Sequence, residues 1–350
     1  MKAGIYFGPG DLRVTEVDVP KPSPDDILVR VRECGICASE IRTFKTGSLH
    51  TKPPRILGHE VAGDIAVVGS QVRGFSVGMR VVLYPTIACG KCSMCRSGKQ
   101  ENLCLNADGL AWGIDGGLAE YVLVPSRMIS NGGVCEIPEG ASYSEAALSE
   151  PMSCALNSLS TLRIPAGGTM MIIGAGTMGF LHLILSKRVT PVRKVIVSEM
   201  FDDRLDLARK LGADYTINPS KENVEERIKE LTDGEGADGV VTAVGSPTVI
   251  EQAVKMVRRT GVLNIFGGCP PGSTIKLDPN VVHYNELTVT GTIGGSLEMF
   301  KKCISLIGNR EVDVRPLITH HFPLDRINEA FKVAQQSNAF RVLVEPQLVQ

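Results

Sequence analysis

The sequence predicts an α/β protein of two domains, in which a doubly wound parallel-sheet domain is inserted into a β-rich domain. The length of 350 residues suits two domains at about 150 residues each. Short strands separated by Gly and Pro dominate the first half, whereas strands and helices alternate from residue 165 onward. The tail ends in a further strand. We therefore expect residues 1–152 and 293–350 to form one domain and residues 153–292 the other.

The expected elements follow from the spacing of the apolar residues. In the β-rich domain, residues 26–32 alternate at period two, and residues 118–124 form another strand. In the inserted domain, apolar strands alternate with helices, which is the pattern of a parallel sheet. Its strands are 169–173, 195–198, 239–243, 262–266 and 287–292, and its helices are 177–187, 203–211 and 248–259. The tail adds two helical stretches and a strand at 341–345.

Composition excludes several classes of partner. The 37 basic and 38 acidic residues leave a formal net charge of −1, so no global charge favours nucleic acid or an anionic membrane. No apolar segment of signal-peptide length opens the chain. We therefore expect a cytoplasmic protein, in which the ten cysteines are thiols or metal ligands rather than disulfides.

A dinucleotide fingerprint lies between the first strand and the first helix of the inserted domain. Gly174 permits a tight turn, Gly176 lets the backbone approach a pyrophosphate, and Gly179 lets the helix pack closely on the strand. The helix begins at Thr177, and the amides of Thr177 and Met178 would face the phosphates of the dinucleotide. The pattern predicts a nicotinamide or flavin dinucleotide site.

An acidic residue in register strengthens this prediction. Glu199 ends the next strand, where a carboxylate would bind the ribose hydroxyls. Val244 and Gly267, which follow two later strands, are also assigned to the cofactor site.

Four of the ten cysteines, Cys89, Cys92, Cys95 and Cys104, fall within 16 residues. This density favours a closed, structural Zn²⁺ site with four sulfur ligands. One competing interpretation is four unrelated buried thiols. The other is a zinc ribbon that binds nucleic acid, but few basic residues lie near these cysteines.

A second metal cluster is spread along the β-rich domain. Cys37 follows a strand, His59 and Glu60 follow a loop, and Glu150 ends the first part of the domain. One thiolate, one imidazole and a carboxylate would hold zinc and leave a position open, as catalytic sites do. Each residue also has an ordinary interpretation: a core thiol, a hydrogen-bonded histidine, or a charge at a helix start.

At these residues the sequence resembles the zinc-dependent medium-chain alcohol and polyol dehydrogenases, nearest to the L-iditol 2-dehydrogenase-like, or sorbitol dehydrogenase-like, branch. The motifs occur in the family's order: Gly58-His59-Glu60-x-x-Gly63, the cysteine cluster, Gly116-Gly117-x-Ala119-Glu120-Tyr121, Glu150-Pro151 and Gly174–Gly179. The resemblance implies a GroES-like catalytic domain, a Rossmann domain, two Zn²⁺ ions per chain, and a homodimer or homotetramer.

The resemblance also assigns residue roles. Cys37 and His59 are then catalytic-zinc ligands, and Glu60 and Glu150 compete for the third position. With one glutamate bound the site is neutral, so we expect one at a time. Glu40 orients His59 through its second ring nitrogen. Ser39 relays the proton of the alcohol substrate, and the hydride of the same substrate goes to the nicotinamide.

The expected cofactor is NAD rather than NADP. The charge of Glu199 would repel a 2′-phosphate. Arg204 argues for NADP, since an arginine can accommodate that phosphate, but NAD-dependent polyol dehydrogenases carry Arg there too. We interpret it as lying beside the adenine or steadying Glu199.

The expected substrate is a secondary alcohol, most simply a polyol or sugar alcohol that is oxidised to a ketone or ketose. Three departures from the family stand against sorbitol itself: Arg42 and Thr43 replace a His and a Tyr, Gly294-Gly295 replace an Arg-Tyr pair, and eight residues rather than seven separate Cys95 from Cys104. Arg42 would favour a sugar-alcohol phosphate, or is a solvated charge.

Two further hypotheses concern the class of substrate and the class of protein. A simple secondary alcohol or threonine is a second substrate candidate. A metal-free reductase or crystallin-like protein on the same fold should lack the Cys37/His59 pair. Trp112 belongs to the substrate cleft, the core or an interface. Adjacent His320 and His321 should point to opposite faces of a strand, so neither receives a ligand role.

Overall fold

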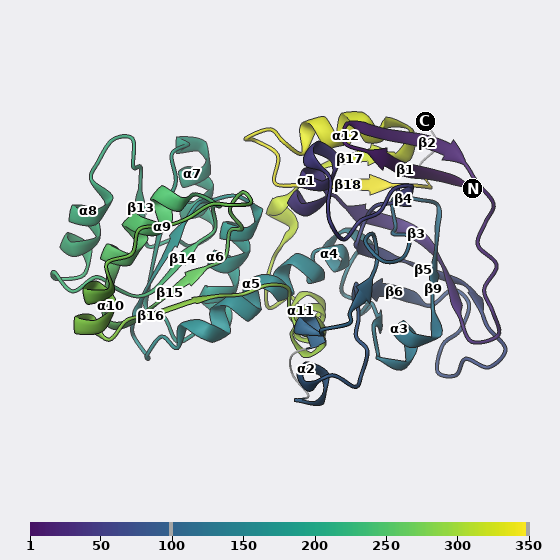
Figure 1. The fold of residues 1–350 in the computed structure, drawn as a ribbon, viewed down its shortest axis with the longest axis horizontal. Helices are drawn as coiled ribbons and strands as arrows, with labels where there is room; N and C mark the ends of the chain where they lie inside the picture. Colours follow the sequence, from purple (N-terminus) through teal and green to yellow (C-terminus); the bar gives the residue numbers. More distant parts are fainter. Residues whose placement is uncertain (98–100, 348–350) are drawn as a thin grey trace. The chain divides into compact units, whose positions relative to one another are not determined.

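The computed structural model describes residues 1–97 and 101–347, which form two compact units (Figure 1). One unit comprises Met1–Glu150 and Ser296–Gln350, and the other comprises Pro151–Gly295. The expected limits at residues 152 and 293 lie two residues after Glu150 and three before Ser296. Within the described part of the chain, no helix is both long and apolar enough to cross a bilayer.

The first unit is built around a seven-stranded sheet with the order β10-β6-β5-β3-β18-β17, and β9 also pairs with β3. The tail therefore returns to the first part of the chain, because β18 and β17 extend the sheet beside β3. The strands are β3 (Ile27–Gly35), β5 (Glu60–Val68), β6 (Arg80–Leu83), β9 (Tyr121–Val124), β10 (Val134–Glu136), β17 (Ile318–Pro323) and β18 (Arg341–Glu345).

Smaller sheets and short helices complete this unit. A three-stranded sheet has the order β2-β1-β4, and β7 pairs with β8. These strands are β1 (Lys2–Gly8), β2 (Asp11–Glu16), β4 (Arg55–Ile56), β7 (Thr86–Ile87) and β8 (Asp108–Gly109). The helices are α1 (Ala38–Thr46), α2 (Ser93–Arg96), α3 (Ser126–Ser130), α4 (Tyr143–Ala147), α11 (Leu297–Gly308) and α12 (Ile327–Val333).

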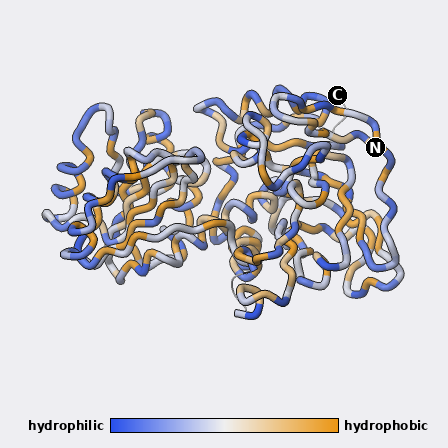
Figure 2. Tube along the Cα trace, viewed as in Figure 1, coloured by the Kyte–Doolittle hydropathy of each residue, from blue (hydrophilic) through white to orange (hydrophobic). Residues whose placement is uncertain are grey.

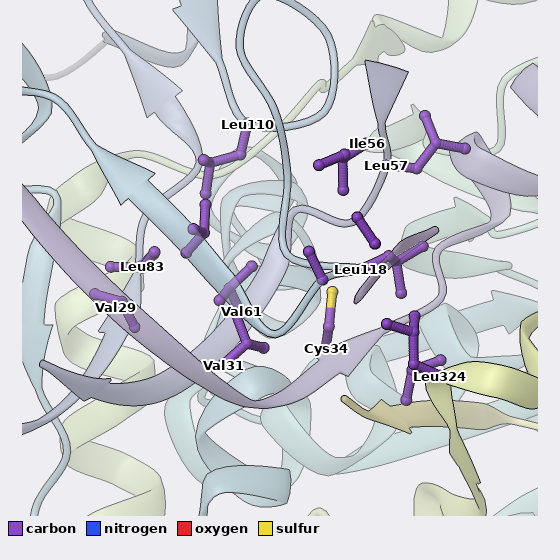
Figure 3. Packing of buried hydrophobic residues seen from close by; sticks show 14 of the residues in the cluster. Val29, Val31, Cys34, Ile56, Leu57, Val61, Leu83, Leu110, Leu118 and Leu324 are labelled. Carbon is purple, nitrogen blue, oxygen red and sulfur yellow. The ribbon is translucent and has the colours of Figure 1, made fainter. Parts of the chain in front are cut away.

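The core of the first unit lies between these sheets. Alternate residues of β3, Ile27, Val29 and Val31, are fully buried, as the period-two pattern requires. Figure 3 shows Val29 and Val31 in one cluster with Val61 and Leu83 from the neighbouring strands. Burial of each such side chain is worth about 1.5–3 kcal/mol. This packing fixes the strand ends that carry the metal-site residues.

The strand expected at 118–124 begins later than predicted, at Tyr121. The preceding backbone is occupied elsewhere: Leu118 O accepts from Gly4 N at 2.8 Å and Leu118 N donates to Leu57 O at 2.9 Å. These bonds join loops and β1, so residues 118–120 form only an isolated bridge.

The second unit has one six-stranded parallel sheet with the order β13-β12-β11-β14-β15-β16. Renumbered from its first strand this is 3-2-1-4-5-6, the order of doubly wound dinucleotide-binding folds. Figure 2 shows hydrophobic residues along these strands. The strands are β11 (Thr169–Ile173), β12 (Lys194–Ser198), β13 (Tyr215–Ile217), β14 (Ala237–Thr242), β15 (Val257–Ile265) and β16 (Thr288–Gly291).

The helices of this unit alternate with its strands. They are α6 (Thr177–Val189), α7 (Asp202–Lys210), α8 (Val224–Leu231), α9 (Pro247–Ala253) and α10 (Pro279–Asn285), and α5 (Ser149–Leu162) leads into the unit from Ser149.

One predicted helix was wrong in this unit, and several elements were not predicted. The helix expected at 248–259 ends at Ala253, and Val257 already pairs with Ala237 of β14. The pairing of β15 with β14 therefore outweighs the helical spacing of the apolar residues in this segment. The elements that were not predicted include β13, α8 and α10; β13 is three residues long at the sheet edge, and no residue of α10 is fully buried.

Candidate active site

Two neighbouring strand ends bring Cys37, His59 and Glu60 together. Cys37 caps the N-terminus of α1 just after β3, and Glu60 begins β5 directly after His59. The register pairs Gly35 of β3 with Glu60. One potential ligand atom from each of the three side chains lies within 4.8 Å of the others.

Glu40 holds this arrangement together. Its Oε1 accepts from Gly58 N at 2.7 Å and lies 3.0 Å from His59 Nδ1, while its Oε2 accepts from Cys37 N at 2.8 Å. Glu40 is buried, so these bonds are shielded from water. A carboxylate on Nδ1 favours the tautomer that leaves Nε2 free to bind a metal.

Glu60 is fully buried and forms an ion pair with Arg341, which lies on β18. Its Oε1 accepts from Arg341 Nη1 at 2.8 Å, and the same nitrogen donates to Ile36 O at 3.0 Å. Among the described residues, Glu60 Oε2 has no hydrogen-bond partner. Sequence analysis missed Arg341; the available signal was an arginine that opens an apolar terminal strand.

Glu150 approaches the same histidine from the first turn of α5. Its Oε2 lies 3.9 Å from His59 Nε2. Both glutamates are therefore within reach of an ion bound by His59. Burial raises the pKa of Glu60, and the charge of Glu150 raises it further despite Arg341.

The residues fit a zinc ion. Burial lowers the pKa of His59, but Glu40 and the Cys37 thiol outweigh it and hold that pKa well above its usual value. The pocket therefore attracts positive charge. A sulfur, a nitrogen and a carboxylate oxygen are zinc ligands, and the unpaired, buried Glu60 oxygen is satisfied when it binds a cation.

Trp112 lies next to the histidine of this cluster. The Trp112 ring lies 6.4 Å from the His59 ring, edge to face at 69°. Ser39 is exposed in the first turn of α1. Arg42 is also exposed, which agrees with a solvated charge, whereas Thr43 is buried.

The four clustered cysteines also converge. The Sγ atoms lie 4.0 Å apart for Cys89 and Cys95, 3.5 Å for Cys92 and Cys95, and 3.8 Å for Cys92 and Cys104. A tetrahedral zinc with bonds of about 2.3 Å requires sulfur pairs roughly 3.8 Å apart. The extra residue before Cys104 does not prevent convergence, although residues 98–100 lie outside the described part of the chain.

The donor groups favour a thiolate at Cys89 and Cys92, whereas burial and the neighbouring cysteines raise the pKa of Cys95. The backbone N–H groups of Lys91 and Cys92 lower the pKa of Cys89, because they donate hydrogen bonds to its sulfur. The set therefore fits a closed zinc site.

The glycine turn of the second unit has the form that a dinucleotide requires. Gly174 has φ +99°, and a Cβ on Gly179 would lie 1.9 Å from Gly174 O, so only glycine allows the helix this close. A Cβ on Gly176 would meet no atom within 4 Å, which leaves space in front of the α6 N-terminus. Thr177 and Met178 form the first turn of α6.

Glu199 is hydrogen-bonded to the backbone of this turn. Its Oε2 accepts from Ala175 N at 2.8 Å, and Arg204 Nη1 lies 3.5 Å from the same oxygen. Arg204 also lies over the Phe201 ring at 5.2 Å. This position agrees with an arginine that steadies Glu199.

The remaining cofactor candidates lie at the same end of the sheet. A Cβ on Gly174 would approach Val244 Cγ1 to 2.5 Å, and one on Gly267 would approach the Val244 carbonyl carbon to 2.4 Å. Val244 and Gly267 thus border the glycine turn.

A glycine turn of the dinucleotide-binding type on a parallel sheet, and a cluster of potential metal ligands in the other unit, are typical of metal-dependent dehydrogenases. Residues 23–138 match the alcohol dehydrogenase GroES-like domain, and residues 168–309 match the zinc-binding dehydrogenase domain. The chain belongs to the zinc-type medium-chain alcohol and polyol dehydrogenase family. This confirms the family, the fold class and the oxidoreductase activity predicted from the sequence.

Relatives of different specificity cover nearly the whole chain. It is 34% identical to an L-threonine 3-dehydrogenase of Pyrococcus horikoshii, over 94% of each chain. It is 32% identical to a sorbitol dehydrogenase of Bacillus subtilis, over 99% of this chain and 97% of the relative. A zinc-binding dehydrogenase from Sinorhizobium meliloti 1021, solved with NADP, is similar at a TM-score of 0.92, with 30% identity over 99% of both chains.

Proposed function

We propose that the protein oxidises a secondary alcohol, in a polyol or sugar alcohol, to a ketone with NAD as hydride acceptor. The observation that carries this proposal is the open cluster of Cys37, His59 and Glu60, with Glu150 alongside. Such a ligand set leaves a position for a substrate oxygen, which the four-sulfur cluster does not.

A bound zinc ion supplies Lewis acidity that lowers the pKa of an alcohol oxygen. The protein supplies placement. Glu40 holds His59 through Nδ1, which would leave Nε2 available to bind the ion. Ser39, on the first turn of α1, receives the alcohol proton and passes it to solvent, to which it is exposed. Trp112 provides an apolar wall beside His59.

One glutamate completes the ligand set at a time. Zn²⁺ with a Cys37 thiolate and a single carboxylate is neutral, whereas a second carboxylate would make the site negative and a weaker Lewis acid. Arg341 supports binding of one glutamate at a time, because it balances the negative charge of Glu60 when that carboxylate is not bound to the ion.

The second ion occupies the cluster of Cys89, Cys92, Cys95 and Cys104, which gives two zinc ions per chain. The sulfur distances support this assignment. On the family resemblance, the chain assembles as a homodimer or homotetramer. Ten cysteines that serve as thiols or zinc ligands rather than in disulfides fit a reducing compartment, the cytoplasm.

NAD is the proposed cofactor because the buried Glu199 borders the glycine turn and would repel a 2′-phosphate. Arg204 pairs with this carboxylate, so its charge is already engaged.

Threonine is the second candidate substrate, because L-threonine 3-dehydrogenases are among the relatives. A sugar-alcohol phosphate has less support, since Arg42 is exposed.

The deciding experiment is a kcat/KM screen of the purified enzyme with NAD over polyols, simple secondary alcohols, threonine and sugar-alcohol phosphates. We expect polyols to be the best substrates by at least about tenfold, which corresponds to about 1.4 kcal/mol. A preference for threonine would overturn the substrate proposal alone. No turnover of any alcohol by metal-loaded enzyme that binds NAD would overturn the proposed function.

A further inference from the structure

A third group of metal-ligating side chains lies across three adjacent strands of the first unit. Glu33 lies on β3, Glu345 on β18 and His321 on β17. The register pairs Val344 with Cys34, and its continuation sets Glu345 opposite Glu33. Neither carboxylate takes part in the site described above.

The three side chains are close enough to share one ion. His321 Nδ1 lies 2.7 Å from Glu345 Oε1 and 3.6 Å from Glu33 Oε1. One ligand atom from each lies within 4.8 Å of the other two. Two carboxylates and one imidazole therefore converge at a point where three strands meet.

Glu33 carries a buried oxygen that the protein leaves unpaired. The residue is only 7% exposed, and its Oε1 accepts from Ser144 Oγ at 2.9 Å. Its Oε2 is buried and has no hydrogen-bond partner among the described residues. A buried carboxylate oxygen in this state costs stability unless a further partner binds it.

The cluster carries more negative charge than its one histidine can balance. With His321 protonated, two carboxylates still leave one uncompensated negative charge. Burial raises the pKa of Glu33 to about 8, and the charge of Glu345 contributes. A divalent cation would balance both carboxylates.

We propose that Glu33, His321 and Glu345 bind a divalent transition-metal ion, at a site separate from both zinc clusters. Carboxylate oxygens with one imidazole nitrogen suit Zn²⁺ or Mn²⁺. A dipositive ion on two carboxylates and a neutral histidine gives a neutral site. The His321 side chain is 39% exposed, so water completes the coordination and the ion can enter from solvent.

The ion would tie together three strands, of which two, β3 and β18, carry or contact residues of the candidate active site. β3 runs directly into Cys37, and β18 carries Arg341, which binds Glu60. Binding at Glu33 and Glu345 would cross-link the C-terminal strand to the strand that positions the catalytic cysteine. The ion itself stays outside the chemistry, so its effect is on stability.

The test is Zn²⁺ binding by the full-length protein, purified with its resident ions and then dialysed. Wild type, His321→Gln and Glu345→Gln are titrated with Zn²⁺, and bound metal and Tm are measured. His320→Gln is the matched control, because His320 Nδ1 contacts Thr319 Oγ1 at 3.0 Å instead of the cluster. Mn²⁺ is titrated in parallel as a second probe.

We expect wild type and His320→Gln to bind one more ion per chain than His321→Gln and Glu345→Gln, and to gain thermal stability as it binds. The apparent affinity should fall at least about tenfold in both cluster variants. Equal added metal in all four proteins would show adventitious binding and overturn the proposal. The assay measures no turnover, so failure of the proposed alcohol oxidation would leave its outcome unaffected.

Discussion

At the residue scale, the metal cluster depends on which nitrogen of His59 is free. Glu40 occupies Nδ1 at 3.0 Å, and the same carboxylate accepts from the backbone of Cys37 and Gly58. One buried side chain thus sets the positions of two proposed zinc ligands. The cost of losing it should appear in catalysis rather than in folding alone.

Cys37→Ala and His59→Ala should abolish turnover and leave dinucleotide binding intact, because the glycine turn lies in the other unit. Glu40→Gln should lower kcat/KM about 10–100-fold, the usual effect of removing a residue that orients a ligand. Steady-state kinetics and NADH fluorescence titration measure both effects.

Cys135→Ala is the matched control for these variants, since Cys135 is a buried thiol of β10 with a backbone partner, Gly132 O. Glu60→Gln and Glu150→Gln, analysed for metal content, identify the resting ligand as the one whose loss releases the ion. Near-normal activity in Cys37→Ala would contradict the assignment.

We expect cofactor choice to be decided at one residue as well. Wild type should prefer NAD, because a buried carboxylate at Glu199 opposes a 2′-phosphate. Glu199→Ala should shift the NADP/NAD ratio of kcat/KM toward NADP by about a hundredfold, or roughly 2.7 kcal/mol. Asp206→Ala, an exposed change on α7, should leave the ratio unchanged. A wild-type preference for NADP would contradict the proposal.

At the scale of elements, side-chain caps decide where the short helices begin. Ser142 and Glu145 form a capping box at the start of α4, in which Glu145 Oε2 accepts from Ser142 N at 3.0 Å. Glu145 also pairs with Arg310, which follows α11. One buried carboxylate therefore joins two helices of the first unit.

Glu145→Gln should destabilise this unit by about 1–3 kcal/mol. Burial alone would raise the pKa of Glu145, but the Ser142 hydrogen bonds and Arg310 outweigh it and hold that pKa below its usual value. A carboxyl whose pKa is lowered by folding stabilises the protein above its unfolded pKa, about 4.3 for glutamate, and loses that contribution as the pH falls through its folded pKa.

The difference in unfolding free energy between wild type and Glu145→Gln should therefore be largest above about pH 5 and shrink below about pH 4. Urea unfolding at several pH values measures it. Glu139→Gln, an exposed change before α4, is the control. A difference that stays constant through this range would show that the charge of Glu145 does not contribute.

At the scale of the whole molecule, two metal clusters in one unit should have separable effects. After dialysis and before any metal is added, the purified chain should hold two zinc ions, one in each of these clusters. Cys95→Ser should reduce this to one and lower Tm by about 5 °C or more with most activity kept, because a closed site stabilises the fold. His59→Ala should also hold one ion, but should lose activity with little change in Tm.

Elemental analysis with thermal unfolding distinguishes these outcomes. Four freely titrating thiols and a single metal ion in the wild type would show that the cysteine cluster is empty.

Local sequence determined much of this architecture. The strand–glycine–helix run from Thr169 to Val189 was predictable, because its turn, its helix start and its buried strand all depend on neighbouring residues. The same is true of the four cysteines, which span 16 residues. Family motifs then supplied Cys37, His59 and the two glutamates.

Tertiary structure decided the contacts between distant strands. Arg341 meets Glu60 across 281 residues of sequence, because β18 returns beside β3, and no local pattern records that pairing. The same return places Glu345 and His321 beside Glu33. Sequence by itself determined the elements, the glycine turn and the ligand types, since these depend on local periodicity and chemistry. Only the sheet register decided which buried charges meet, because pairing between strands is set by packing over the whole unit.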